Sequence, residues 1–125
     1  MSNPQLPIAP VEACNPAPRV REPLTAEAAV ELAAVFKALS DPVRLRLLSS
    51  IASREGQEAC VCDLSEGIDL TQPTISHHLK VLRSAGLLTS ERRASWVYYR
   101  VVPQALQHVS EALLLESGAT AEVPA

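Results

Sequence analysis

The chain has 125 residues, a formal net charge of −3 and four aromatic residues, one Trp, two Tyr and one Phe. That length suits a single domain, and so few aromatic residues mean that Leu, Val, Ile and Ala must fill its core, as in packed helices. No stretch approaches the roughly eighteen apolar residues of a membrane span. The N-terminus also lacks the charged start and apolar stretch of a secretory signal. We therefore expect a cytoplasmic protein that does not enter a membrane.

The charge is distributed unevenly along the chain. Residues 71–100 carry five basic residues and one acidic residue, a net charge of +4, whereas residues 1–70 carry −4 and residues 101–125 carry −3. A basic middle between acidic flanks is typical of a localised phosphate-binding face. A chance cluster of solvated charges is the alternative that charge alone leaves open.

The first segment, residues 1–23, contains six of the ten prolines. Proline fixes φ and lacks a backbone donor, so this segment is expected to be an extended, flexible arm. Cys14 lies in this arm. Residues 24–116 are predicted to form the folded domain, and residues 117–125 a flexible tail.

Three helices are predicted before residue 70, from apolar residues at helical spacing and from start signals. Thr25 caps the first helix, in which Leu39 is the last apolar residue. Ser40-Asp41-Pro42, an oxygen-bearing cap followed by proline, starts the second helix, which fades near residues 54–56. A short third helix is predicted from about Cys60 to Glu66, ended by Gly67.

A fourth helix, a hairpin and a last helix follow. Thr71 caps the fourth helix and Gly86 ends it. Residues 89–102 alternate in polarity and are rich in β-branched and aromatic types, which predicts a two-stranded hairpin turning near Arg93-Ala94-Ser95. Pro103 starts the last helix. The predicted fold is mainly α with a small β-hairpin, in the order of a winged helix-turn-helix domain.

The fourth helix has an apolar face, formed by Ile75, Leu79 and Leu82, and a polar face. Amides and hydroxyls near the N-terminus of a recognition helix reach base edges, and basic groups on a hairpin contact the DNA backbone. His78 is expected to be partly buried and hydrogen-bonded. The predicted partner is double-stranded operator DNA, and the candidate contact residues are Gln72, Thr74, Ser76, His77, Lys80, Arg83, Arg92 and Arg93.

Three segments in this order resemble the ArsR/SmtB family of metal(loid)-sensing repressors, in its arsenic-responsive type. FKALSDPVRL (residues 36–45) resembles the entry to the family's second helix, CVCDL (60–64) its metalloid-binding box, and LTQPTISHHLKVL (70–82) its recognition helix. The resemblance implies a winged-helix homodimer joined through its first and last helices, which leaves DNA when an inducer binds. Two departures are Gly67, where leucine is commoner, and Ala94-Ser95, where the wing usually has glycine.

Cys60 and Cys62 are the candidate inducer ligands. Two residues on a regular helix are about 200° apart, too far for both sulfurs to hold one small ion. Either Cys60 precedes the helix or the helix opens on binding, and we expect a mixture of both. Ligation would distort the third helix, which positions the fourth. Because the chain has three cysteines and no export signal, free thiols are expected rather than disulfides.

The expected ligand set is Cys14, Cys60 and Cys62. Related arsenic repressors often carry a third cysteine where this chain has Ser65. Cys14 is the only thiol left, and the extended arm can carry it to the box, within one subunit or across the dimer; an idle thiol in the arm is the alternative. Three sulfurs suit arsenite, As(III), and antimonite equally, with no organic cofactor. Cadmium and lead generally prefer a fourth sulfur and structural zinc wants four ligands. No metal is expected on the last helix, where the family's second site lies.

The predicted function is repression of resistance genes, relieved by trivalent arsenic or antimony. One alternative is a cadmium- or lead-responsive repressor of the same family. Another is a thiol redox switch in which Cys14 oxidises onto Cys60 or Cys62. An enzyme is not expected, because no nucleophile with a base, phosphate loop or acidic pair is apparent.

Overall fold

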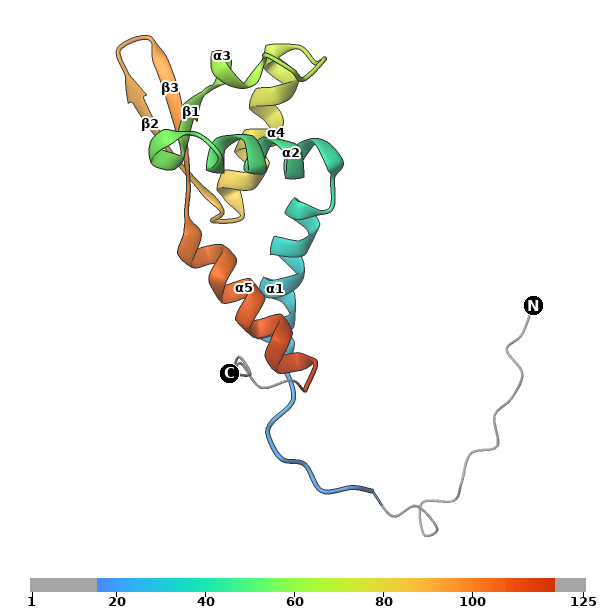
Figure 1. The fold of residues 1–125 in the computed structure, drawn as a ribbon. Helices are drawn as coiled ribbons and strands as arrows, with labels where there is room; N and C mark the ends of the chain where they lie inside the picture. The colour runs from blue at the N-terminus through green and yellow to red at the C-terminus, as the bar shows by residue number, and fades with distance from the viewer. Residues whose placement is uncertain (1–15, 119–125) are drawn as a thin grey trace, which may run out of the picture.

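The computed structural model describes residues 16–118 (Figure 1). The order of helices and the β-hairpin is the winged helix-turn-helix order that the sequence predicts. Cys14, with most of the arm and of the tail, lies outside the described residues. In chain order, the elements are α1 (Ala26–Leu39), α2 (Pro42–Ala52), the 3-10 turn η2 (Glu55–Gln57), β1 (Glu58–Cys60), α3 (Val61–Leu64), α4 (Gln72–Ser84), β2 (Leu88–Arg93), β3 (Trp96–Val101) and α5 (Pro103–Glu116).

The helix starts follow the predicted caps. The hydroxyl of Thr25 accepts a hydrogen bond from the N–H of Ala28 at 3.1 Å. The carboxylate of Asp41 accepts from the N–H groups of Val43 and Arg44 at 2.8 and 3.1 Å, and the bond from Arg44 is the main cause that lowers the pKa of Asp41. Each cap satisfies backbone donors that the first helical turn leaves without partners.

The sheet has three antiparallel strands in the order β1-β3-β2, one more than the predicted hairpin. Strand β1 pairs with β3 so that Glu58 lies opposite Arg100 and Cys60 opposite Tyr98. A strand of three residues is too short to show the alternation that identifies strands in a sequence. The short helix predicted from about Cys60 to Glu66 is α3, which spans only Val61–Leu64, because Cys60 ends β1.

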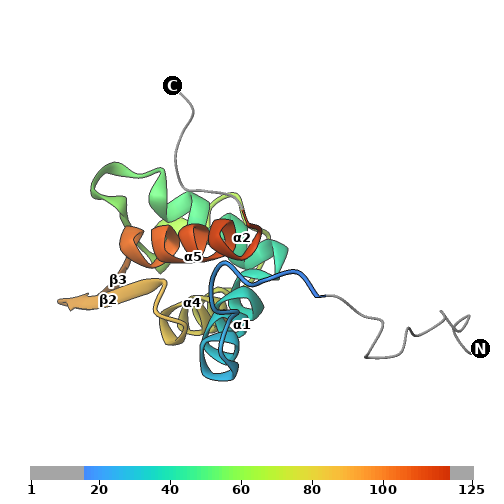
Figure 2. The ribbon, with the colours of Figure 1, turned by 90° about the horizontal axis from the view of Figure 1, so that it is seen from below.

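The core lies between α2, α3, α4 and the sheet. Its largest fully buried side chains are Leu47, Ile51, Leu64, Ile75, Leu79, Leu82, Leu87 and Leu88. Helices α1 and α5 lie side by side at the opposite end of the molecule, and the β2–β3 hairpin projects away from the helices (Figures 1 and 2). Among residues 16–118, no helix combines the length and apolarity that crossing a bilayer requires.

Candidate DNA-reading surface and thiol site

Helix α4 presents a polar face to solvent. Its apolar residues Ile75, Leu79 and Leu82 are fully buried, which turns the intervening positions outward. Within residues 16–118, the side chains of Gln72, Ser76 and Lys80 form no hydrogen bond or ion pair, so their polar groups are available to an external partner. Among the candidate contact residues on this helix, Ser76 is half-buried and the exposed ones are Gln72, Thr74, His77, Lys80 and Arg83.

Two of these polar side chains are also held by neighbours. The hydroxyl of Thr74 lies 2.9 Å from that of the cap residue Thr71, and Arg83 donates to the hydroxyl of Ser90 on β2 at 2.9 Å. The second bond joins the recognition helix to the hairpin. Helix and hairpin therefore form one continuous surface.

His78 has the environment predicted for it. It is half-buried, and its Nδ1 lies 3.2 Å from Nη1 of Arg44 on α2. The same guanidinium donates to the backbone carbonyls of Ala38 and Lys37 at the end of α1. Arg44 thus braces α4 against the first two helices, through contacts that the sequence did not reveal.

The two arginines of the hairpin differ in their surroundings. Arg92 is exposed and has no partner among the described residues. Arg93 donates to the two carboxylate oxygens of Glu58 at 2.8 and 2.9 Å, donates to Glu91 at 2.9 Å, and lies over the ring of Tyr98. The sequence predicts a DNA contact for Arg93, whose charge is largely engaged within the chain. Its contact with DNA stays a prediction.

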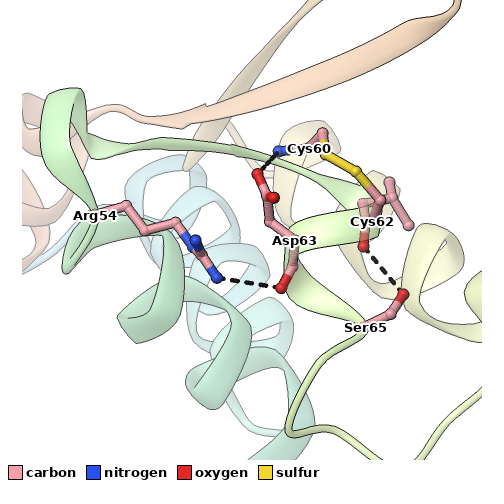
Figure 3. Close-up of a disulfide and its surroundings, with 6 residues drawn as sticks. Arg54, Cys60, Cys62, Asp63 and Ser65 are labelled. Atoms are coloured by element: carbon pink, nitrogen blue, oxygen red, sulfur yellow. Dashed lines mark hydrogen bonds between the residues drawn. A yellow bond between two sulfur atoms is a disulfide. The ribbon is translucent and has the colours of Figure 1, made fainter.

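The thiol site lies where β1 meets α3. Cys60 has extended backbone angles (φ −87°, ψ 165°) and is the N-cap of α3, while Cys62 lies in the first turn of that helix. Of the two arrangements that the sequence left open, the structure has Cys60 before the helix. The two sulfurs therefore face each other without any opening of α3 (Figure 3).

The structure joins these sulfurs in a disulfide between Cys60 and Cys62. The sequence predicts free thiols, and its redox alternative predicts a disulfide from Cys14 to Cys60 or Cys62. The disulfide in the structure differs from both predictions. The reason is local: the extended backbone at Cys60 brings the two Cα atoms to 5.4 Å, within the range that a disulfide spans.

Asp63 completes a cluster that the sequence analysis did not single out. One carboxylate oxygen and the two sulfurs all lie within 4.8 Å of one another. Asp63 also accepts from the N–H of Cys60 at 3.2 Å, so it caps α3 from the third helical position (Figure 3). The signal was an acidic residue three positions after an N-cap, which is the capping-box spacing, here with cysteine in place of serine or threonine.

Helix α3 is held by other elements more than by its own hydrogen bonds. Leu64 is 1% exposed and packs in the core with α4. Arg54, just after α2, donates to the carbonyl of Asp63 at 3.1 Å, and Arg46 donates to that of Gly67 at 3.1 Å. Gly67 has φ +81°, which glycine adopts without strain and leucine does not. A turn in this geometry then leads from α3 into α4.

The other conspicuous surface is apolar and lies on α1 and α5. A cavity of about 450 Å³ opens between these helices and is lined by residues such as Leu32, Val35 and Val109. Val30 and Leu113 are 70% and 53% exposed nearby. Exposed leucine and valine on two neighbouring helices are typical of a surface that another chain covers.

A short helix, α3, and a turn position a second helix, α4, and the β2–β3 hairpin is joined to α4. This arrangement defines a winged helix-turn-helix DNA-binding domain. The family model for bacterial regulatory proteins of the arsR family matches residues 41–90. The "Arsenic resistance transcriptional regulator ArsR1" of Pseudomonas putida is 49% identical over 79 residues, which are 63% of this chain and 60% of that protein. The match thus spans less than two thirds of this relative.

Two further proteins match over most of their length. The "Cadmium resistance transcriptional regulatory protein CadC homolog" of Staphylococcus aureus is 31% identical over 105 residues, 84% of this chain and 85% of that one. The crystal structure of the AntR antimony-specific transcriptional repressor superposes with a TM-score of 0.62 at 31% identity, covering 85% of this chain and 96% of that one. The chain belongs to the arsR family, whose members are DNA-binding transcriptional regulators and not enzymes, as the sequence predicted.

Proposed function

We propose that this protein is a homodimeric repressor that leaves its operator when trivalent arsenic binds the reduced thiols of Cys60 and Cys62. The observation that carries this proposal is the meeting of two sulfurs at the start of α3, the helix that packs against the recognition helix. The names of the relatives add support, since they include regulators of arsenic resistance and an antimony-specific repressor.

The mechanism follows from the packing of α3 against α4, which sets the position of α4 in the fold. A ligand that bonds to both sulfurs needs space between them, so the backbone at the cap of α3 must move. Leu64 and the turn at Gly67 then shift against α4, and the arrangement that fits DNA becomes the less stable one. A coupling free energy of about 1–3 kcal/mol, roughly 5- to 150-fold in operator affinity, is typical for such linked sites.

Trivalent arsenic bonds to three sulfurs, and α3 supplies two. We propose Cys14 as the third ligand, as predicted from the sequence. Antimonite is expected to occupy the same set. Asp63 adds a fourth donor atom beside the three sulfurs, and cadmium and lead generally take four ligands, so a cadmium- or lead-responsive repressor is the alternative to test beside it.

The DNA contacts that we propose are Gln72, Thr74, Ser76, His77, Lys80 and Arg83 on α4, with Arg92 and Arg93 on the wing. All of these residues except the half-buried Ser76 and Arg93 are exposed, which supports this role, as does the basic character of residues 71–100. The apolar surface of α1 and α5 is proposed to be the dimer interface. A dimer places two α4 helices on half-sites about one helical turn of DNA, or a multiple of one turn, apart.

Titration of the repressor–DNA complex with arsenite under strict reduction tests the function. We expect release of DNA without any oxidant. Cys14→Ser should weaken arsenite binding and leave DNA affinity unchanged, and arsenic absorption spectroscopy should count three sulfur neighbours in the unmodified protein and two in the variant. An unchanged response of Cys14→Ser would show that the third ligand is not this cysteine.

The disulfide between Cys60 and Cys62 favours one second candidate, a thiol redox switch within α3. In that case a disulfide oxidant would take two electrons and two protons from the thiol pair, leaving the Cys60–Cys62 disulfide, and would itself be reduced to two thiols. If such an oxidant releases DNA from the reduced protein and arsenite does not, this candidate replaces the first.

A further inference from the structure

Glu58 lies two residues before Cys60, on the strand that leads into the thiol site. Side chains on a strand alternate between its faces, so Glu58 and Cys60 share one face of β1. Arg100 and Tyr98 lie opposite them on β3. The other face of the sheet is turned to the core, where Ala59 and Tyr99 are buried. Cys60, which is itself buried, and Glu58 therefore lie on the same face of the sheet.

The carboxylate of Glu58 bridges the whole width of this sheet. It accepts two hydrogen bonds from Arg93 at the far end of β2, at 2.8 and 2.9 Å, and one from Arg100 on β3 at 2.8 Å. Its side chain is 21% exposed, the least of the charged groups in this cluster. These bonds lower the pKa of Glu58 to about 2, so it is charged at neutral pH.

Tyr98 forms a second connection between the same two places. It lies directly opposite Cys60 in the β1–β3 register. The guanidinium of Arg93 lies 4.5 Å from the centre of its ring. Cross-strand neighbours on one face are close enough for their side chains to touch. A displacement at Cys60 therefore meets Tyr98 directly and Arg93 through it.

We propose that Glu58 is a positioning residue that couples the thiol pair to the wing, so that an inducer moves the β2–β3 hairpin as well as the recognition helix. This inference rests on the proposed function and extends it. A three-residue strand moves as one piece, so a shift of Cys60 carries Glu58 with it. Glu58 in turn draws Arg93, the last residue of β2, which follows the exposed Arg92 on the same strand.

The chain contains its own reporter for this motion. Trp96, the only tryptophan, pairs with Arg93 across the hairpin and is 55% exposed. No residue of α3 or α4 contributes to tryptophan emission. A change in the emission of Trp96 when a ligand binds the thiols, in the absence of DNA, therefore reports on the wing.

The experiment compares the reduced unmodified protein with Glu58→Gln and Glu91→Gln. Glu91 is the matched control, because its carboxylate also binds Arg93 and is lost in the same way, but it lies on β2 and makes no link to β1. Arsenite and, separately, Cd²⁺ are added, thiol occupancy is followed by sulfur-to-metal absorbance, and Trp96 emission and operator affinity are recorded.

We expect occupancy of the thiols to change Trp96 emission in the unmodified protein and in Glu91→Gln, and most of that change to be lost in Glu58→Gln. The ratio of operator affinities without and with arsenite should fall about 2- to 30-fold in Glu58→Gln, the usual range for residues on a coupling route. An emission change as large in Glu58→Gln as in Glu91→Gln would overturn the inference, as would occupied thiols with no emission change in the unmodified protein. Failure of the proposed function would be seen separately, as occupied thiols with DNA still bound.

Discussion

Helix α4 and the segment from β1 to α3 lie side by side in the fold but are stabilised in different ways. Helix α4 has thirteen residues, a hydroxyl cap at Thr71 and a buried apolar stripe, so its own sequence favours it. Helix α3 has four residues, fewer than a helix needs to be stable alone. It depends on Leu64, on the capping carboxylate of Asp63 and on Arg54. The comparison shows that α4 is favoured by its own sequence, whereas the β1–α3 segment keeps its conformation only through contacts with neighbouring elements. A ligand can therefore move the β1–α3 segment.

The largest expected effect tests whether the β1–α3 segment is where arsenite acts. Replacing both Cys60 and Cys62 by serine should abolish the effect of arsenite on operator affinity, because no soft ligand remains on α3. Operator affinity without arsenite should stay within the range of the unmodified protein, since neither sulfur faces DNA in the proposed complex. Fluorescence anisotropy with labelled operator measures both. Release of this thiol-free variant by arsenite would disprove the proposed sensing site.

The next effect concerns the packing that holds α3 on α4. Leu64→Ala should lower the free energy of unfolding by about 2–5 kcal/mol, as is usual for a fully buried leucine. Leu45→Ala, at a half-exposed position of α2, is the control and should cost far less. Urea denaturation followed by circular dichroism measures both. Equal effects of the two changes would show that α3 is not held by its core contact.

The polar face of α4 can be tested independently of the thiols. Gln72→Ala, Ser76→Ala and His77→Ala should each weaken operator binding by about 1–3 kcal/mol if the side chain reads a base, with arsenite binding unchanged. Ser84→Ala, at the C-terminal end of the same helix, is the matched control. Discrimination between operator and unrelated DNA is the measurement, and unchanged discrimination in all three variants would remove the base-reading role.

A smaller effect is expected at the wing turn, where Ala94 has φ +56°. A left-handed conformation costs a residue with a Cβ about 1–2 kcal/mol, and glycine avoids that cost. Ala94→Gly should therefore stabilise the protein by up to about 1 kcal/mol, part of the gain being offset by the greater freedom of glycine in the unfolded chain. A lower midpoint of thermal unfolding in this variant would contradict the inference that the backbone at Ala94 is strained.

The smallest effect is a pH dependence from Glu58. Its pKa is about 2 in the folded protein and near its ordinary value of 4.5 when unfolded, chiefly because Arg93 and Arg100 donate hydrogen bonds to the carboxylate. The carboxylate therefore stabilises the fold above pH 4.5, and that contribution is lost as the pH falls from 4.5 towards 2. Glu58→Gln should reduce the acid sensitivity of urea denaturation in this window. An identical pH profile in both proteins would show that these ion pairs contribute nothing to folding.

Much of the architecture could be predicted from short-range patterns. The caps at Thr25, Asp41 and Thr71 and the alternating residues 89–102 identified elements that the structure contains. Residues beside each other in the chain carry these signals, so no tertiary information is needed. Strand β1 and the true start of α3 could not be predicted in this way, because three or four residues show no period and their conformation is decided by pairing with β3 and by packing on α4.

The sequence by itself determined the winged-helix order, the polar face of α4 and the pair of cysteines at the start of α3, because helix caps and residue spacing are local properties. Only the tertiary structure decided that the two sulfurs meet, that Asp63 joins them, and that Arg93 is held by Glu58. These contacts depend on how β1 pairs with β3 in the sheet, and Glu58 and Arg93 are thirty-five positions apart in the chain. Side-chain pairing over that separation is set by the packed fold and not by local propensity.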